Sequence, residues 1–229
     1  MAVEQNGGWV RSRRARKAAA LVAAALPTNG LRKWAYRLLH GYVFGPGVKL
    51  AHGVFIAVDR FECGADVSIS RGNRFYGPIR VVMGAKTFIG PRNQIMCGDA
   101  VVDAWADDRN YGRALLIGAD CLINEGHMFD VVGTITVEDG AWLAGFRSQF
   151  VTHGASVRDR DIHIGARSFL GTAVLMAPGS SLGPDTLLAM GSLVTKKFTE
   201  ANVIVGGTPA RVLRMRDPAD EHQFEKVWQ

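Results

Sequence analysis

Histidines and clustered cations are the residues of this sequence best suited to chemistry. His127, His153 and His163 lie 26 and 10 residues apart; a zinc site needs three well-placed protein ligands plus water, which this spacing does not supply convincingly, so we expect no bound metal. A single imidazole ionises near neutral pH and can take a proton from a hydroxyl or an amine. Near the C-terminus, Lys196 and the run from Arg211 to Arg216 supply cations that can neutralise phosphate, or that simply form a solvated basic end.

The three cysteines give no comparable signal. Cys63, Cys97 and Cys121 form no CxxC spacing, and an odd number of cysteines provides no disulfide framework. A reducing compartment is the simplest setting for such a chain, so we predict a cytoplasmic protein, with the inner face of the membrane as a further option.

Positive charge is concentrated at one end of the 229-residue chain. The formal net charge is +6, but residues 1–40 hold eight Lys/Arg against one acid, whereas the remainder holds 19 against 20. A neutral body does not offer the basic folded surface that nucleic-acid binding needs, so we expect no nucleic-acid partner. No apolar run approaches the ~20 residues that cross a bilayer.

The basic end is predicted to form two helices. Residues 11–26 join a basic run to an alanine-rich stretch, either a secretory signal or a helix that Pro27 ends. Asn29 is available to cap a second helix whose apolar residues recur at helical spacing. This arm can pack on its own domain, or residues 9–43 can rest on an anionic membrane surface.

A six-residue repeat dominates the rest of the chain. Large apolar residues recur at Ile164, Leu170, Met176, Leu182, Leu188 and Val194. Further runs are Cys63, Ile69, Phe75 and Val81; Met83, Ile89 and Ile95; Ile117, Ile123, Phe129 and Ile135; and Val137 and Leu143. This period fits neither a helix nor an alternating strand. It fits short strands that turn a corner every six residues, so that three hexads close one triangular coil.

The hexads and the segment from Ile164 to Arg214, which contains Val194-Thr-Lys and Val205-Gly-Gly-Thr-Pro-Ala-Arg-Val-Leu-Arg214, resemble the hexapeptide-repeat acyltransferases. The similarity is strongest to the sugar O-acetyltransferase branch, which includes maltose and galactoside acetyltransferases. It implies an all-β fold, a left-handed parallel β-helix of triangular coils. We assign residues 1–45 to the helical arm, 46–208 to the β-helix and 209–229 to a short helical C-terminal tail.

Two segments interrupt the repeat, and such loops often carry function. Residues 98–114 contain Trp105, and residues 150–161 contain His153. The family places its catalytic histidine on a loop of this kind, in a Thr-His context that Thr152-His153 matches. We therefore predict His153 as the general base; His163, beside an anchor of the unbroken repeat, is the alternative.

The resemblance also implies where the acceptor binds. Family members often have Asn and Asp on the coil before the histidine loop, contacting the acceptor or orienting the histidine. Asn124 and Asp130 match two of these positions, whereas Gly126 stands where a second Asn is common. We predict acceptor contacts by Asn124, His127, Asp130 and Trp105, with a structural role as the alternative for His127.

Coenzyme A lies between adjacent subunits in this family, near the last coils. The matching residues are Phe169, Gly171, Thr172, Met190, Ser192, Thr195, Lys196, Arg211 and Arg214. The resemblance thus implies a homotrimer that uses acetyl-CoA for O-acetylation of a saccharide or glycoconjugate by direct transfer. Alternatives are a xenobiotic or amino-sugar N-acetyltransferase of the same fold and a non-catalytic β-helix scaffold.

Overall fold

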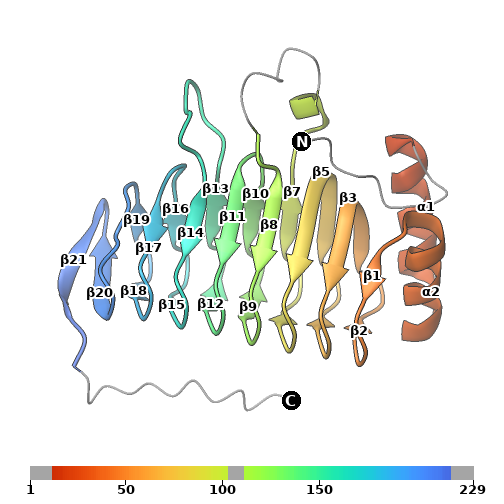
Figure 1. The fold of residues 1–229 in the computed structure, drawn as a ribbon, viewed down its shortest axis with the longest axis horizontal. Coiled ribbons are helices and arrows are strands. Elements are labelled where there is room, and N and C mark those ends of the chain that lie inside the picture. Colours follow the sequence, from red (N-terminus) through yellow and green to blue (C-terminus); the bar gives the residue numbers. More distant parts are fainter. Residues whose placement is uncertain (1–11, 103–110, 218–229) are drawn as a thin grey trace.

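The computed structural model describes residues 12–102 and 111–217. Two helices, α1 (Arg13–Ala25) and α2 (Asn29–His40), lie at one end of a long prism of parallel strands (Figure 1). The prism has three faces, and a short 3-10 helix, η1 (Asp99–Val102), leaves its side.

Parallel strands stack along each face, one per coil. Face A contains β1 (Val43–Phe44), β3 (Phe55–Cys63), β5 (Arg74–Met83), β8 (Ala114–Ile117), β11 (Thr134–Val137), β14 (Ile162–Ile164) and β17 (Ser181–Leu182). Face B contains β7 (Gln94–Met96), β10 (Met128–Asp130), β13 (Gln149–Val151), β16 (Leu175–Met176) and β19 (Leu193–Val194). Face C contains β2 (Lys49–Leu50), β4 (Ser68–Ile69), β6 (Phe88–Ile89), β9 (Leu122–Glu125), β12 (Trp142–Phe146), β15 (Phe169–Leu170), β18 (Leu187–Leu188), β20 (Val203–Gly207) and β21 (Ala210–Met215). Strands β3 and β5 are long because each bends from face B onto face A.

The repeat anchors form the core, as the sequence predicts. Every anchor of the six-residue repeat is at most 5% exposed, and the six from Ile164 to Val194 are fully buried. Met176 pairs with Val194, one coil of 18 residues later, whereas Ile117 pairs with Val137 after 20 residues. The repeat shifts by two residues where a strand on face A is two residues longer. In such a strand two side chains, for example Ile135 and Val137, point inward.

The basic arm is a cap on the first coil. Tyr36 Oη accepts from Ile56 N (3.1 Å) and donates to Val54 O (2.8 Å), and Tyr42 Oη bonds both Val58 N and Val58 O. These groups belong to β3 and the turn before it, at the open end of the prism. Because backbone groups at an open sheet edge otherwise seek another chain, the arm closes this end of the core.

Cations of α2 complete the cap by donating to carbonyl oxygens of the first coil. Buried Arg32 donates to Leu50 O (2.7 and 3.2 Å), and Lys33 Nζ donates to Val48 O (2.8 Å). Arg37 donates to Phe44 O (2.8 Å). The charge of this helix is thus largely used within the protein, and the arm packs on its own domain.

Three details of the predicted boundaries change. Thr28, and not Asn29, caps α2 by accepting from Leu31 N (3.2 Å); Asn29 instead bonds the backbone of β2. The sheet begins at Val43, before the predicted boundary at residue 46. Residues 210–215 form β21, antiparallel to β20, in place of the first part of the predicted helical tail, because a turn at residues 207–210 returns the chain along the free edge of β20. Residues 218–229 lie outside the described residues.

Candidate active site

The site lies at the edge where face B turns into face A, which we call the histidine edge. β10 ends there at Asp130 and β13 ends at Val151, and these two residues are paired neighbours on adjacent coils. The chain then leaves the prism as the loop of residues 152–161, which projects at the top of Figure 1. A strand end followed by a loop leaves side chains that are fixed at the base and open to solvent above.

His153 and Asp130 are brought together at this edge. His153 Nδ1 lies 2.9 Å from Asp130 Oδ2, and the exposed fractions of the two side chains are 68% and 17%. An ionised carboxylate only accepts hydrogen bonds, so Nδ1 of His153 carries the proton of the neutral ring. Nε2 then has a lone pair that can accept a proton from another molecule. A solvent-facing imidazole oriented by a carboxylate is the arrangement expected of a general base.

The loop that carries His153 is held at both ends. At its start, buried Thr152 bonds the backbone of residues 130–133. At its end, Asp161 Oδ1 accepts from Thr134 N (2.7 Å), and Arg160 Cζ stacks over the Tyr111 ring at 4.7 Å. The Arg160 contact joins this loop to the other insertion, and neither partner was predicted as a site residue.

His127 has the opposite surroundings and is a correction to the predicted acceptor contacts. It is 1% exposed; Ser148 N donates to its Nδ1 (3.1 Å), and its Nε2 donates to Leu143 O (3.2 Å). Burial lowers the pKa of His127 to about 4. Both ring nitrogens are used inside the protein, so His127 is a structural residue of the core.

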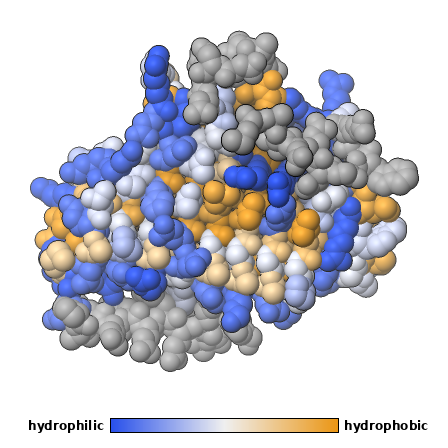
Figure 2. All heavy atoms as spheres, in the orientation of Figure 1, coloured by the Kyte–Doolittle hydropathy of each residue, from blue (hydrophilic) through white to orange (hydrophobic). Residues whose placement is uncertain are grey.

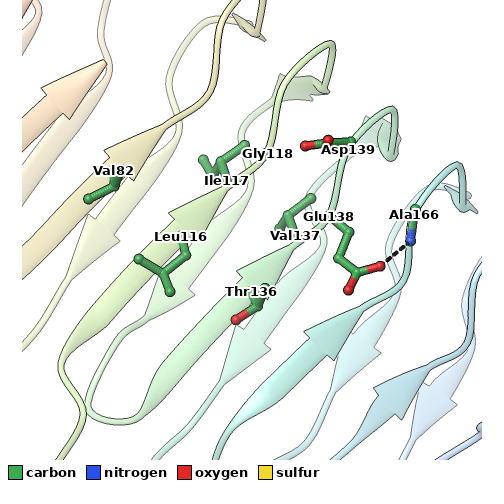
Figure 3. Close-up of a pocket in the computed structure, with 9 residues that line it drawn as sticks. All are labelled: Val82, Leu116, Ile117, Gly118, Thr136, Val137, Glu138, Asp139 and Ala166. Carbon is green, nitrogen blue, oxygen red and sulfur yellow. Dashed lines mark hydrogen bonds between the residues drawn. The ribbon is translucent and has the colours of Figure 1, made fainter. Parts of the chain in front are cut away.

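His163 lies on face A, where its Nε2 is 3.2 Å from Glu138 Oε1. Beside Glu138 is a hollow of about 400 Å³ whose floor includes the half-buried Val82 and Leu116 (Figure 3). Figure 2 shows apolar residues gathered over the middle of this face. None of the predicted acceptor or coenzyme residues that the structure describes lines this hollow.

The remaining predicted residues divide between two edges. Thr195 and Lys196 follow β19, two coils beyond β13, and so lie on the histidine edge at about 10 Å from the level of Val151. The opposite edge, where face C turns into face B, carries Asn124, Gly171, Thr172 and Met190, and we call it the donor edge. Gly171 N bonds Leu188 O and Gly191 N bonds Thr172 O, which stacks these turns directly.

Asn124 is therefore separated from Asp130, another predicted acceptor contact on this coil. The two residues stand on opposite edges of face B, although both belong to one coil. The acceptor contact predicted for Trp105 lies outside the described residues.

Exposure distinguishes the predicted coenzyme residues. Met190 is 77% exposed, and Arg211 and Arg214 are exposed on β21 at the end of face C. Phe169 is half-buried on face C between Trp142 and Leu187. Ser192 is different: it is 1% exposed, and its hydroxyl donates to Ala189 O (2.6 Å) and accepts from Gly207 N (3.2 Å). Its side chain braces a corner of the prism and is not available to a ligand.

Known proteins share this architecture. Galactoside O-acetyltransferase of Escherichia coli (strain K12) is 35% identical over 136 residues, which are 54% of this chain and 66% of that protein. The chain is thus similar to a sugar O-acetyltransferase, as its six-residue repeat predicts. No family model matches the sequence. The chain spans slightly less than two thirds of the length of this relative.

A solved structure agrees on the fold. UDP-N-acetylglucosamine acyltransferase from Campylobacter jejuni superposes with a TM-score of 0.53 at 15% identity and covers 76% of this chain and 71% of its own. A hexapeptide-repeat acetyltransferase from Vibrio cholerae, complexed with acetyl coenzyme A, covers 90% and 87% at 18% identity with a TM-score of 0.47. The fold is the left-handed parallel β-helix that the sequence predicts.

Proposed function

We propose that this protein is an acetyl-CoA-dependent O-acetyltransferase acting on a hydroxyl of a saccharide or glycoconjugate. The hydrogen bond between His153 and Asp130, on a loop at the edge of the prism, is the observation that carries the proposal. The similarity to galactoside O-acetyltransferase supports acetyl transfer and a sugar acceptor.

Direct transfer needs a general base beside the acceptor hydroxyl, and this edge supplies one. Nε2 of His153 takes the proton of the acceptor hydroxyl as its oxygen attacks the thioester carbonyl. The tetrahedral intermediate then expels the coenzyme A thiolate, which receives the proton back from His153. Asp130 holds the ring and stabilises the transient imidazolium.

A cysteine nucleophile has no support among the described residues. Cys63 and Cys97 are buried, and desolvation raises the pKa of each thiol to about 12. Both are therefore thiols at neutral pH and unsuited to attack a thioester.

We further propose a homotrimer with sites shared between chains. Within one chain, the donor edge and the histidine edge are separated by the width of face B, about 13 Å for the four residue steps from Ala173 to Ala177. A second chain that sets its donor edge against the histidine edge of the first would bring both groups to one acceptor. Outward apolar residues on two faces, among them Leu116 and Trp142, support such contacts.

Membrane contact is a separate proposal that rests on the outer side of the cap. Leu21, Val22 and Trp34 are each about 60% exposed there, and Leu31 and Leu38 are more than 40% exposed. No helix of the described residues is long and apolar enough to cross a membrane. If the cap rests on lipid, the full chain should co-sediment with anionic vesicles, whereas Trp34→Glu should reduce the bound fraction several-fold without changing the fold. Equal sedimentation of both proteins would remove this proposal.

Acetyl-CoA binding tests the main proposal, with ADP as the control for unspecific attraction of phosphate to a basic chain. Calorimetry should give one saturable site per chain for acetyl-CoA and much weaker binding of ADP. His153→Ala should keep this binding and lower turnover with saccharide acceptors by about 10²–10⁴-fold, the usual contribution of a general base. Absence of binding at millimolar acetyl-CoA would overturn the acetyltransferase and favour the scaffold, whereas turnover restricted to amine acceptors would favour N-acetylation.

A further inference from the structure

Thr152 has an unusual set of partners for a residue at the start of a loop. It is fully buried, and its hydroxyl donates to Asp130 O (2.5 Å). The same oxygen accepts from Val132 N and from Gly133 N, both at 2.9 Å. Thr152 N also donates to Asp130 O (3.2 Å). One side chain thus satisfies three backbone groups of the turn that follows β10.

These bonds replace a missing part of the sheet. Asp130 and Val151 are the last paired residues of β10 and β13, and beyond them the chain of the next coil departs as the 152–161 loop. Buried backbone N–H groups that lose their strand partner must find another acceptor. The Thr152 hydroxyl is that acceptor for Val132 and Gly133.

The position of Thr152 makes this bracing relevant to the site. Asp130, whose carboxylate holds His153, is bonded through its own carbonyl to Thr152, and His153 is the next residue in the chain. The His153 side chain is mostly exposed and has little packing to fix it. Its placement therefore depends on the relative position of two backbones that Thr152 ties together.

We propose that Thr152 is a positioning residue that sets the geometry of the Asp130–His153 pair. This inference rests on the proposed function for its effect on turnover, but its effect on the imidazole can be measured without turnover. Misplacement of a catalytic group by about 1 Å can cost 10²-fold in rate. Loss of the hydroxyl should therefore lower kcat. It should leave coenzyme binding intact, since Thr152 makes none of the hydrogen bonds that hold the turns of the donor edge together.

The experiment compares Thr152→Val, which keeps the volume and removes the hydroxyl, with Thr152→Ser, which keeps the hydroxyl. Thr87→Val is the matched control, because Thr87 is also buried and its hydroxyl bonds Gly118 O and Cys121 N at the third edge of the prism, where face A turns into face C, away from the histidine edge and the donor edge. Nitrogen-15 NMR of histidine-labelled protein at pH 8.5 reports the tautomer of His153, with His153→Gln identifying its signals. Kinetics give kcat and KM, and calorimetry gives acetyl-CoA affinity.

We expect the Nδ1–H tautomer of His153 in the wild type, Thr152→Ser and Thr87→Val, and a mixed or Nε2–H population in Thr152→Val. Thr152→Val should lose about 10–100-fold in kcat with acetyl-CoA affinity unchanged. An unchanged tautomer and kcat in Thr152→Val, or an equal loss of kcat in Thr87→Val, would overturn the inference. If Thr152→Val does not fold, Thr152→Cys serves instead, with the same tautomer change expected and an unchanged tautomer counting against the inference. A wild type without transferase activity that still shows the tautomer change would refute the proposed function and keep the positioning role.

Discussion

At the scale of single residues, surroundings decide what a histidine does in this protein. His127 and His153 lie near the same coil, but one is enclosed with both nitrogens bonded and the other faces solvent with one nitrogen free. Desolvation favours the neutral ring of His127 over its cation. His40, stacked on Tyr42 at 4.9 Å in the cap, is likewise buried, and its pKa is lowered to about 4.

Burial of His40 and His127 predicts that the folded protein loses stability in acid. The unfolded chain takes up protons at these side chains near pH 6.5, whereas the folded protein resists them until about pH 4. The free energy of unfolding should therefore fall as the pH is lowered through this window, by at most about 3 kcal/mol per histidine. Urea denaturation at a series of pH values would measure it.

His127→Gln should flatten this dependence, since glutamine does not titrate. His163→Gln is the control, because His163 is exposed on face A. An identical pH dependence in wild type and His127→Gln would show that the burial of His127 does not produce the effect.

At the scale of elements, the cap explains why the chain concentrates its charge at one end. Arg32, Lys33 and Arg37 reach carbonyl oxygens of the first coil, and two tyrosine hydroxyls bond β3. A long cationic side chain can place its donors on a carbonyl while its stem covers apolar surface. The basic residues of this helix are therefore explained by the carbonyl oxygens of the first coil, which need hydrogen-bond donors.

Tyr36→Phe should destabilise the protein by about 1–3 kcal/mol, because Ile56 N and Val54 O would lose a buried partner. The melting temperature should fall accordingly. Tyr76→Phe is a suitable control: the hydroxyl of the half-buried Tyr76 donates to the weak acceptor Met96 Sδ (2.9 Å), so its removal should change stability little. Equal melting temperatures for Tyr36→Phe and wild type would refute the capping role.

Sequence periodicity predicted the fold well because one residue in every six must be a large apolar side chain that points into the prism. Each anchor must fill the interior of a coil, so residue type alone reports its location. The helix boundaries and β21 were harder to predict from the sequence. Thr28 and Asn29 are both good helix caps, and β21 forms only because it can pair with the free edge of β20. The pairing of His153 with Asp130 was only indicated by resemblance, and the Thr152 bonds depend on backbone groups that sequence does not display.

At the scale of the whole molecule, the division of candidate residues between two edges is the main functional constraint. Met190 and Thr172 occupy the donor edge, and His153 and Lys196 occupy the histidine edge. If the proposed trimer forms its sites between chains, no site uses both edges of the same chain.

Mixing of inactive variants tests this arrangement. His153→Ala removes the base, and Met190→Glu places a negative charge at an exposed position of the donor edge, where the coenzyme is proposed to bind. Each variant alone should be nearly inactive, whereas trimers reassembled from both should recover a substantial part of wild-type turnover per intact site. Sedimentation equilibrium should give three chains per particle. A monomer, or a mixture as inactive as its components, would contradict the shared site.

The cap also prevents prisms of different molecules from stacking end to end. A solenoid grows by adding identical strands to its end, and nothing in a coil of hexads itself stops another molecule from docking there. The side chains of α2 occupy the backbone groups that such a molecule would use. The arm therefore acts as a terminator, which keeps a self-templating surface from joining prisms end to end into fibres.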